Sequence, residues 1–211
     1  MRKVPIAFDR YLTYQELTGY LQAVSAAYPE LVELASIGKS YEGRDVWVVT
    51  VTNKTTGPAA EKPALYADGN IHAGEVTASM VLLYLIDYLV TNFERDPEVK
   101  RLLDTRAFYL LPRVNPDGAE KYLTTPFLLR SSVRPYPEAG SEELPGLHPA
   151  DIDGDGRILQ MRVRDDAKGE WKISRRDPRL LIPRAPGETG GPFYRLYTEG
   201  FIKDYTGEPF D

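Results

Sequence analysis

The sequence predicts an α/β sandwich built around a mixed sheet. Stretches with helical periodicity alternate with short apolar runs between residues 13 and 111, and this alternation is typical of a sheet covered by helices. Two of the apolar runs are separated only by a turn-rich link, which favours an antiparallel pair. A third run is followed by a long helical stretch, so parallel neighbours are also expected.

The individual elements can be placed in order. Thr13-Tyr14-Gln15-Glu16 fits a capping box, and the apolar spacing that follows predicts a helix ending near Pro29. The β-branched runs 31–37 and 46–51 predict the antiparallel pair. The remaining elements are expected at 63–68 and 107–111 for strands, and at 74–92 and 97–103 for helices.

The composition excludes several classes of function. The net charge of -5 is mild, and there is no Lys/Arg stripe, so no nucleic-acid partner is expected. The chain contains no cysteine, so a transition metal must be bound by His and carboxylate side chains. The longest apolar stretch, residues 81–90, is too short for a membrane span. Without a signal-like N-terminus, we expect no membrane partner and, by default, a cytoplasmic location.

The run from Leu65 to Glu75 carries the clearest functional pattern. A strand pattern stops at Asp68, Gly69 provides a turn, and His72 and Glu75 open the next helical stretch. Imidazole and carboxylate groups are good zinc donors, and residues three apart at a helix start face the same side. The pattern predicts two ligands of one zinc ion in an open cleft at the carboxyl end of the strands. A hydrogen-bonded histidine without metal is the alternative.

A second motif, Asn115-Pro116-Asp117-Gly118, follows the next predicted strand. The combination of His72-Ala73-Gly74-Glu75 and then this motif, in that order, resembles the zinc metallocarboxypeptidase family, the carboxypeptidase A/B-like peptidases. Residues 28–32, 37–40 and 42–44 are similar to the opening of that domain. The resemblance covers about residues 10 to 135 and implies a three-layer α/β/α sandwich with a mixed central sheet.

The resemblance implies roles for particular residues. His72 and Glu75 correspond to the first two zinc ligands of the family, and Arg130 falls where its oxyanion-stabilising arginine is expected. Arg134 is the rival for that role, and an ordinary surface ion pair is the other interpretation of Arg130. In the implied mechanism, zinc polarises the scissile carbonyl of a peptide or peptide-like substrate, and a guanidinium stabilises the oxyanion.

Other family residues have no match in this sequence. The third zinc ligand of the family is a histidine downstream of an Asn-Arg pair, and a general-base glutamate follows later, but no Asn-Arg dipeptide occurs here. We therefore expect residues 1–211 to be a single, incomplete zinc carboxypeptidase-like domain that lacks its C-terminal part. His148 is the remaining candidate for a third ligand, although it lies too near Asn115 for the family order, which favours a surface histidine.

The sequence changes character after Pro126, and residues 127–211 form a Pro/Gly/Asp-rich, insertion-like region. Within it, Asp151, Asp153 and Asp155 occupy the first, third and fifth positions of a calcium-loop pattern, and a glycine is at the sixth. The twelfth position is Arg162 instead of an acidic residue. An acidic hairpin without metal is therefore favoured over a Ca²⁺ site, which stays open as the alternative.

Three functions stay open at this stage. The motifs favour a zinc-dependent carboxypeptidase that hydrolyses a C-terminal peptide bond. A catalytically inactive binding domain of the same fold is an alternative from a different class. A zinc-dependent deacylase of N-acyl amino acids is a second alternative, which the Asn-Pro-Asp-Gly motif disfavours.

Overall fold

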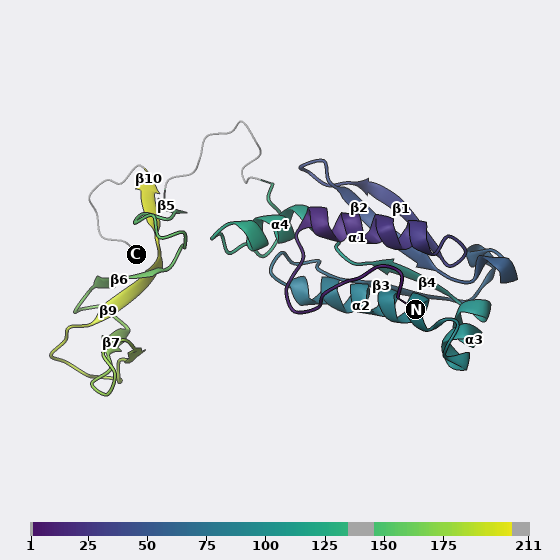
Figure 1. Cartoon of the computed structure of the whole chain (residues 1–211). Coiled ribbons are helices and arrows are strands. Elements are labelled where there is room, and N and C mark those ends of the chain that lie inside the picture. The colour runs from purple at the N-terminus through teal and green to yellow at the C-terminus, as the bar shows by residue number, and fades with distance from the viewer. Residues whose placement is uncertain (1, 135–145, 204–211) are drawn as a thin grey trace. The chain divides into compact units, whose positions relative to one another are not determined.

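A computed structural model describes residues 2–134 and 146–203 of the chain (Figure 1). The chain divides into two compact units, which we call unit 1 (Met1–Ala139) and unit 2 (Gly140–Asp211). Unit 1 contains both sequence motifs, and unit 2 contains the Asp-rich loop. Residues 135–145 and 204–211 of the insertion-like region lie outside the described residues. A single domain over residues 1–211 stays a prediction.

Unit 1 is built on a four-stranded mixed sheet with the strand order β1-β2-β4-β3 (Figure 1). β1 and β2 form the expected antiparallel hairpin, β2 pairs antiparallel with β4, and β4 pairs parallel with β3. The mixed sheet predicted from the sequence is confirmed. The strands are β1 (Val32–Lys39), β2 (Asp45–Val51), β3 (Ala64–Asp68) and β4 (Ala107–Leu111).

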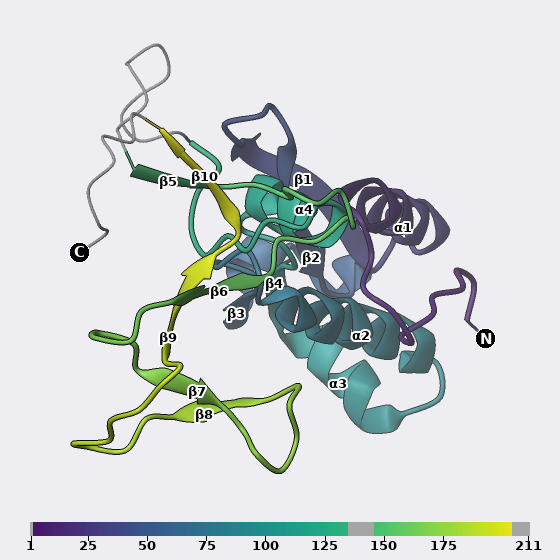
Figure 2. The same ribbon diagram turned by 90° about the vertical axis from the view of Figure 1, so that its left-hand side faces the viewer.

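The first three helices of unit 1 pack against one face of this sheet (Figure 2). Val49 and Leu110 are buried in a single core cluster with Leu21 and Leu83 from the helices. On the opposite face of the edge strand β3, Tyr66 is 61% exposed. The helices are α1 (Tyr14–Ala27), α2 (Val76–Asn92), α3 (Pro97–Thr105) and α4 (Pro116–Thr124), with 3-10 turns at Lys54–Thr56 and Ala59–Glu61.

The sequence analysis did not predict α4, although its start is well specified. Asn115 caps the helix by accepting the Gly118 N–H at 2.9 Å, and Pro116 occupies the first turn, where a missing N–H costs nothing. The helix is only 9 residues long, too short for its apolar spacing to stand out. The capping box at Thr13 that begins α1 is confirmed, with Glu16 as the reciprocal partner.

Unit 2 contains short strands that the sequence analysis also did not predict. β5 (Gly146–Pro149) pairs with β10 (Gly200–Lys203), and a second, antiparallel sheet has the order β6-β9-β7-β8. Each strand has three to five residues, a length at which two-residue alternation cannot be recognised. The second sheet consists of β6 (Gln160–Arg164), β7 (Trp171–Ile173), β8 (Leu181–Pro183) and β9 (Tyr194–Thr198).

No single helix in the described residues has the length and apolar composition needed to cross a membrane. α2 and α3 reach that length and composition only when taken together, and they are bent by 106° with respect to each other.

Candidate metal centre

The two predicted ligands lie in the loop that connects β3 to α2. The sequence analysis placed them at the start of a helix from residue 74, but the helix begins at Val76. Asn70 adopts a left-handed backbone conformation with φ 57°, which Asn tolerates better than most residues. After this turn, Nδ1 of His72 lies 2.9 Å from Oε1 of Glu75. Their side chains are 39% and 55% exposed. The fold therefore brings the two side chains together in an accessible position beyond the carboxyl end of β3.

Arg130 reaches this pair from a separate segment of the chain. Its Nη2 lies 3.3 Å from Nε2 of His72, and its Nη1 lies 3.8 Å from Oε1 of Glu75. A guanidinium can only donate hydrogen bonds, so Nε2 of His72 is the acceptor and Nδ1 carries the proton that it shares with Glu75. The three predicted site residues therefore form one cluster.

A chain of buried polar side chains lies beneath the His72 loop. The Asn70 amide donates to the carbonyl oxygens of His72 at 2.7 Å and Ala73 at 3.2 Å, and it accepts the Ser79 hydroxyl at 3.0 Å. Ser79 in turn accepts a hydrogen bond from Nε of Arg113 at 3.3 Å. Burial lowers the pKa of Arg113 to about 10, so it remains a cation at neutral pH. The sequence analysis assigned no role to these residues, because buried hydrogen bonds between distant positions leave no spacing pattern in the sequence.

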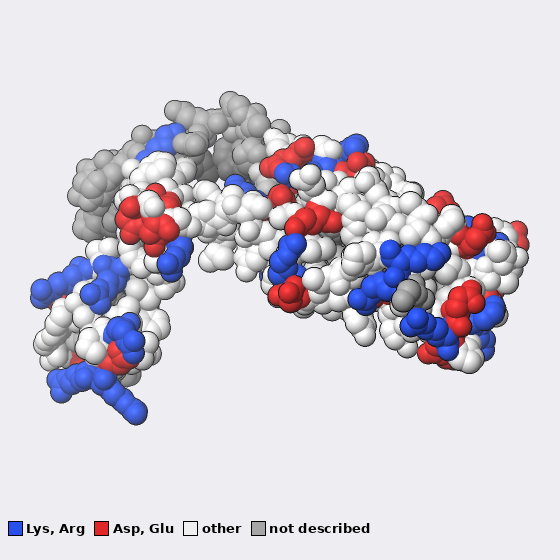
Figure 3. Space-filling model, viewed as in Figure 1, with Lys and Arg blue, Asp and Glu red and all other residues white. Residues whose placement is uncertain are grey.

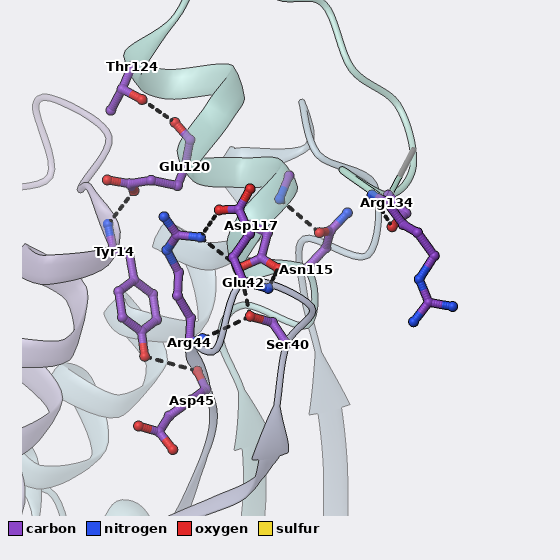
Figure 4. A network of polar contacts seen from close by, with 12 residues as sticks. Tyr14, Ser40, Glu42, Arg44, Asp45, Asn115, Asp117, Glu120, Thr124 and Arg134 are labelled. Atoms are coloured by element: carbon purple, nitrogen blue, oxygen red, sulfur yellow. Dashed lines mark hydrogen bonds and ion pairs between the residues drawn. The ribbon is translucent and has the colours of Figure 1, made fainter. Parts of the chain in front are cut away.

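The Asn-Pro-Asp-Gly motif fixes the neighbouring loop (Figure 4). Asp117 accepts hydrogen bonds from the Ser40 hydroxyl at 2.7 Å, the Glu42 amide at 2.9 Å and Nη1 of Arg44 at 2.8 Å. Burial raises the pKa of Asp117, but these donors outweigh it and keep the pKa below its ordinary value. The motif therefore anchors the start of α4 to the β1–β2 turn, a role that sequence reasoning did not assign.

Two hollows adjoin the cluster, and His72 contributes to both. One has a volume of about 280 Å³, and the other has a volume of about 510 Å³. The smaller hollow is bordered by Glu75, Arg130 and apolar side chains, and the larger by a mixture of polar and apolar side chains. The smaller is lined by His72, Gly74, Glu75, Tyr122, Leu128, Leu129 and Arg130.

The two rivals for site roles lie elsewhere. The guanidinium of Arg134 lies 5.3 Å from the centre of the Tyr41 ring, and it points away from Asn115 and Asp117 (Figure 4). His148 lies in β5 of unit 2, where its ring stacks on Phe201 at 5.4 Å. Arg130 is therefore the arginine that contacts the His72 and Glu75 pair.

The Asp-rich loop of unit 2 folds around its own carboxylates, and acidic side chains gather beside β10 (Figure 3). Oxygen atoms of Asp151, Asp153 and Glu199 lie within 4.8 Å of one another. Asp155, the third acidic residue of the sequence pattern, accepts the Arg157 amide at 2.8 Å. Glu199 was missed because it lies far along the chain from the loop. These carboxylates accept backbone N–H groups, and a Ca²⁺ ion at this loop stays an untested alternative.

Comparison with known proteins places this chain in a family. The family model described as zinc carboxypeptidase matches residues 17–147, which is more than half of the chain. The chain belongs to the zinc carboxypeptidase family. The matched part of this chain spans only a fraction of the length of its relatives.

Two curated relatives show the extent of this similarity. Mouse (Mus musculus) carboxypeptidase M is 35% identical over 111 residues, which are 53% of this chain and 25% of the relative. The zinc carboxypeptidase of Saccharothrix mutabilis subsp. capreolus is 32% identical over 121 residues, which are 57% of this chain and 28% of the relative. The chain therefore spans about a quarter of the length of these relatives.

Solved structures show the same partial match. The structure of thrombin activatable fibrinolysis inhibitor is similar with a TM-score of 0.53 and 26% identity, covering 58% of this chain and 30% of that one. Carboxypeptidase A from Helicoverpa armigera gives a TM-score of 0.50 and 27% identity, covering 56% of this chain and 28% of that one. The fold of this chain is thus similar to part of the solved carboxypeptidase structures, as the resemblance implied.

The donor atoms of the cluster fit a zinc ion. Nδ1 of His72 and Oε1 of Glu75 are both zinc donors, and they now share one proton that a metal ion would replace. In the described part of the chain, no third His, Cys, Asp or Glu forms a three-donor group with this pair. The pair can therefore supply two of the three protein ligands that a catalytic zinc needs.

Proposed function

We propose that this chain carries part of the active centre of a zinc-dependent carboxypeptidase that hydrolyses a C-terminal peptide bond. In this proposal His72 and Glu75 are metal ligands, and Arg130 stabilises the oxyanion that develops at the scissile carbonyl. The observation that carries the proposal is the cluster of these three side chains in a chain of the zinc carboxypeptidase family.

Each residue has a task that follows from its chemistry. When bound, zinc polarises the scissile carbonyl and lowers the pKa of a bound water. Glu75 supplies negative charge and His72 a neutral nitrogen, a combination that holds the ion while leaving a position for water. The Arg130 side chain is 74% exposed, so its guanidinium can turn from His72 toward a substrate and offer two donors to one oxyanion.

The rest of the active centre is proposed to come from sequence outside these 211 residues. This proposal is supported by the small share of each relative that the chain matches, about a quarter of mouse carboxypeptidase M. Two protein ligands bind zinc weakly, and without a general base the attacking water is not deprotonated. We therefore expect the isolated chain to bind zinc weakly and to show little or no release of C-terminal residues.

Zinc titration followed by NMR tests the ligand assignment directly. The chain has only two histidines, so their ring signals can be assigned by single substitutions. We expect Zn²⁺ to shift the ring signals of His72 and to leave those of His148 unchanged. Glu75→Gln keeps the shape of the side chain and removes its charge, so it should weaken the response of His72 at least tenfold. A response centred on His148 would contradict the assignment.

The role of Arg130 is tested in a protein that also contains the missing ligand and base. Loss of one oxyanion donor typically lowers turnover about 100- to 1,000-fold, so Arg130→Ala should lower kcat by that order and change KM much less. Arg130→Lys should restore little, because a point charge does not reproduce the planar fork. Arg134→Ala is the matched control and should be mild. If Arg134→Ala abolished turnover and Arg130→Ala had no effect, the role would belong to Arg134 and not to Arg130.

A further inference from the structure

The segment that carries Arg130 lies on the surface of unit 1 and is held through its backbone. The Ala73 N–H donates to the Arg130 carbonyl at 2.8 Å, and Nδ2 of Asn115 donates to the Ser131 carbonyl at 2.7 Å. The Arg130 side chain itself is 74% exposed and is not fixed by packing. Besides its own contacts with His72 and Glu75, its position over His72 therefore depends on these two contacts of the segment's backbone.

Asn115 is held rigidly enough to serve as one of these contacts. Its Oδ1 accepts the Gly118 N–H at 2.9 Å, and its own N–H donates to the Asn70 carbonyl at 3.0 Å. The next-but-one residue, Asp117, is tied to the β1–β2 turn and is 4% exposed. The Asn115 side chain is therefore held in a fixed position from which Nδ2 donates to the Ser131 carbonyl.

Gly118 explains how the Asn115 side chain finds room. A Cβ atom at position 118 would lie 2.6 Å from Nδ2 and 2.8 Å from Oδ1 of Asn115, and 2.9 Å from Cβ of Ala73. Any larger residue would displace the Asn115 side chain or the His72 loop. The glycine therefore keeps the first turn of α4, the Asn115 amide and the His72 loop in close contact.

We infer that Asn115 is a positioning residue for Arg130, beyond its role as the cap of α4. The side-chain oxygen caps the helix. The nitrogen of the same amide holds the Arg130 segment in place beside the His72 loop. This inference rests on the proposed function of Arg130, because holding this segment in place matters for function only if Arg130 is catalytic. The contacts themselves are independent of zinc and of activity.

Two substitutions separate the cap from the positioning contact. Asn115→Asp and Asn115→Ser both retain a capping oxygen, and neither can make the hydrogen bond from Nδ2 to the Ser131 carbonyl. Asn115→Ser also leaves the charge unchanged. Amide hydrogen exchange of the 211-residue chain should become about five- to tenfold faster at Ala73 in both variants, because a nearby clamp is lost. Exchange at Gly118 and Ala119 should stay as in the wild type.

A spectroscopic signal reports the Arg130 side chain itself. Its Nη2 donates to Nε2 of His72 at 3.3 Å, so the ¹⁵N shift of Nε2 should move in Asn115→Ser toward its value in Arg130→Ala. Asn115→Ala, which also loses the cap, should in addition speed exchange at Gly118 and Ala119. Wild-type exchange at Ala73 and an unmoved Nε2 signal in Asn115→Ser would overturn the inference. Failure of His72 to bind Zn²⁺, by contrast, would refute the proposed function. It would not change the expected exchange at Ala73 or the expected Nε2 shift.

Discussion

Units 1 and 2 are stabilised in different ways. Unit 1 has a continuous core in which side chains from α1, α2 and the sheet are fully buried, such as Leu21, Leu83 and Val51. In the described part of unit 2, Phe193 is the one large hydrophobic side chain that is buried, at 3% exposure. Apolar burial is the dominant favourable contribution to folding, so the two units draw on very different amounts of it.

Unit 2 relies instead on charged side chains that bond to the backbone. Glu199 accepts the amides of Ile152 at 2.7 Å and Leu159 at 3.0 Å. Arg184 donates to the carbonyl of Glu188 at 2.7 Å and packs 3.9 Å from the centre of the Phe193 ring. These hydrogen bonds lie at or near the surface and remove little apolar area from water. Unit 1 should therefore set the global stability, while unit 2 opens locally at lower cost.

The largest expected effect comes from the core of unit 1. Leu83 is fully buried at 0% exposure, so Leu83→Ala should lower the free energy of unfolding by about 2–5 kcal/mol through lost burial and the cavity left behind. Val81→Ala is the matched control, because Val81 is on the same helix and is 59% exposed. Urea denaturation followed by circular dichroism measures both. Equal losses for the two variants would show that the core does not carry the stability of unit 1.

The contrast between the units also explains which elements could be predicted from the sequence. Long periodic segments such as α2 bury a whole face, so their apolar spacing shows in the sequence. The hairpin of β1 and β2 is marked by a turn-rich link between two β-branched runs. The strands of unit 2 lack this record, because they are short and some of them pair across long stretches of chain, as Met161 does with Tyr197.

The same distinction applies to the candidate site. His72 and Glu75 are three residues apart, so local spacing was enough to predict that they meet. The place of Arg130 came only from the family resemblance, because it meets His72 across 58 residues. The supports of the site, such as Asn70 and Arg113, act through buried hydrogen bonds that only the tertiary structure reveals. The roles of all these residues in catalysis stay predictions.

A smaller effect is expected at Arg184 in unit 2. Its guanidinium donates to the carbonyls of Ala167, Gly169 and Glu188 and lies over the Phe193 ring. Arg184→Ala should therefore lower the stability of unit 2 by about 2 kcal/mol, and Arg184→Lys by nearly as much, because an ammonium cannot span these carbonyls. Exchange of the unit 2 amides measures the loss. Arg179→Ala, at a side chain that is 88% exposed, is the control and should have no effect. If Arg184→Lys kept the wild-type stability, a positive charge alone would be enough at this position.

The smallest effect depends on pH and concerns the acidic loop of unit 2. The backbone amides of Leu159 and Ile152 hold the pKa of Glu199 below its ordinary value of 4.5. Because this pKa is lowered by folding, the contribution of Glu199 is fully present above pH 4.5 and is lost as the pH falls through the lower, folded-state value. We expect the amides of Ile152 and Leu159 to lose protection from exchange in that acidic range, before the core of unit 1 responds.

A neutral side chain separates this cause from general acid effects. Glu199→Gln keeps the size of the group and has no carboxylate to protonate, so the protection of Ile152 and Leu159 should be lower at neutral pH and nearly independent of pH below it. Glu170→Gln, at another acidic residue of unit 2, serves as the control and should keep the wild-type profile. If the Glu199→Gln loop still opened on acidification with the wild-type midpoint, another carboxylate would control the loop. The loop of unit 2 would still be stabilised by charge, but by a residue other than Glu199.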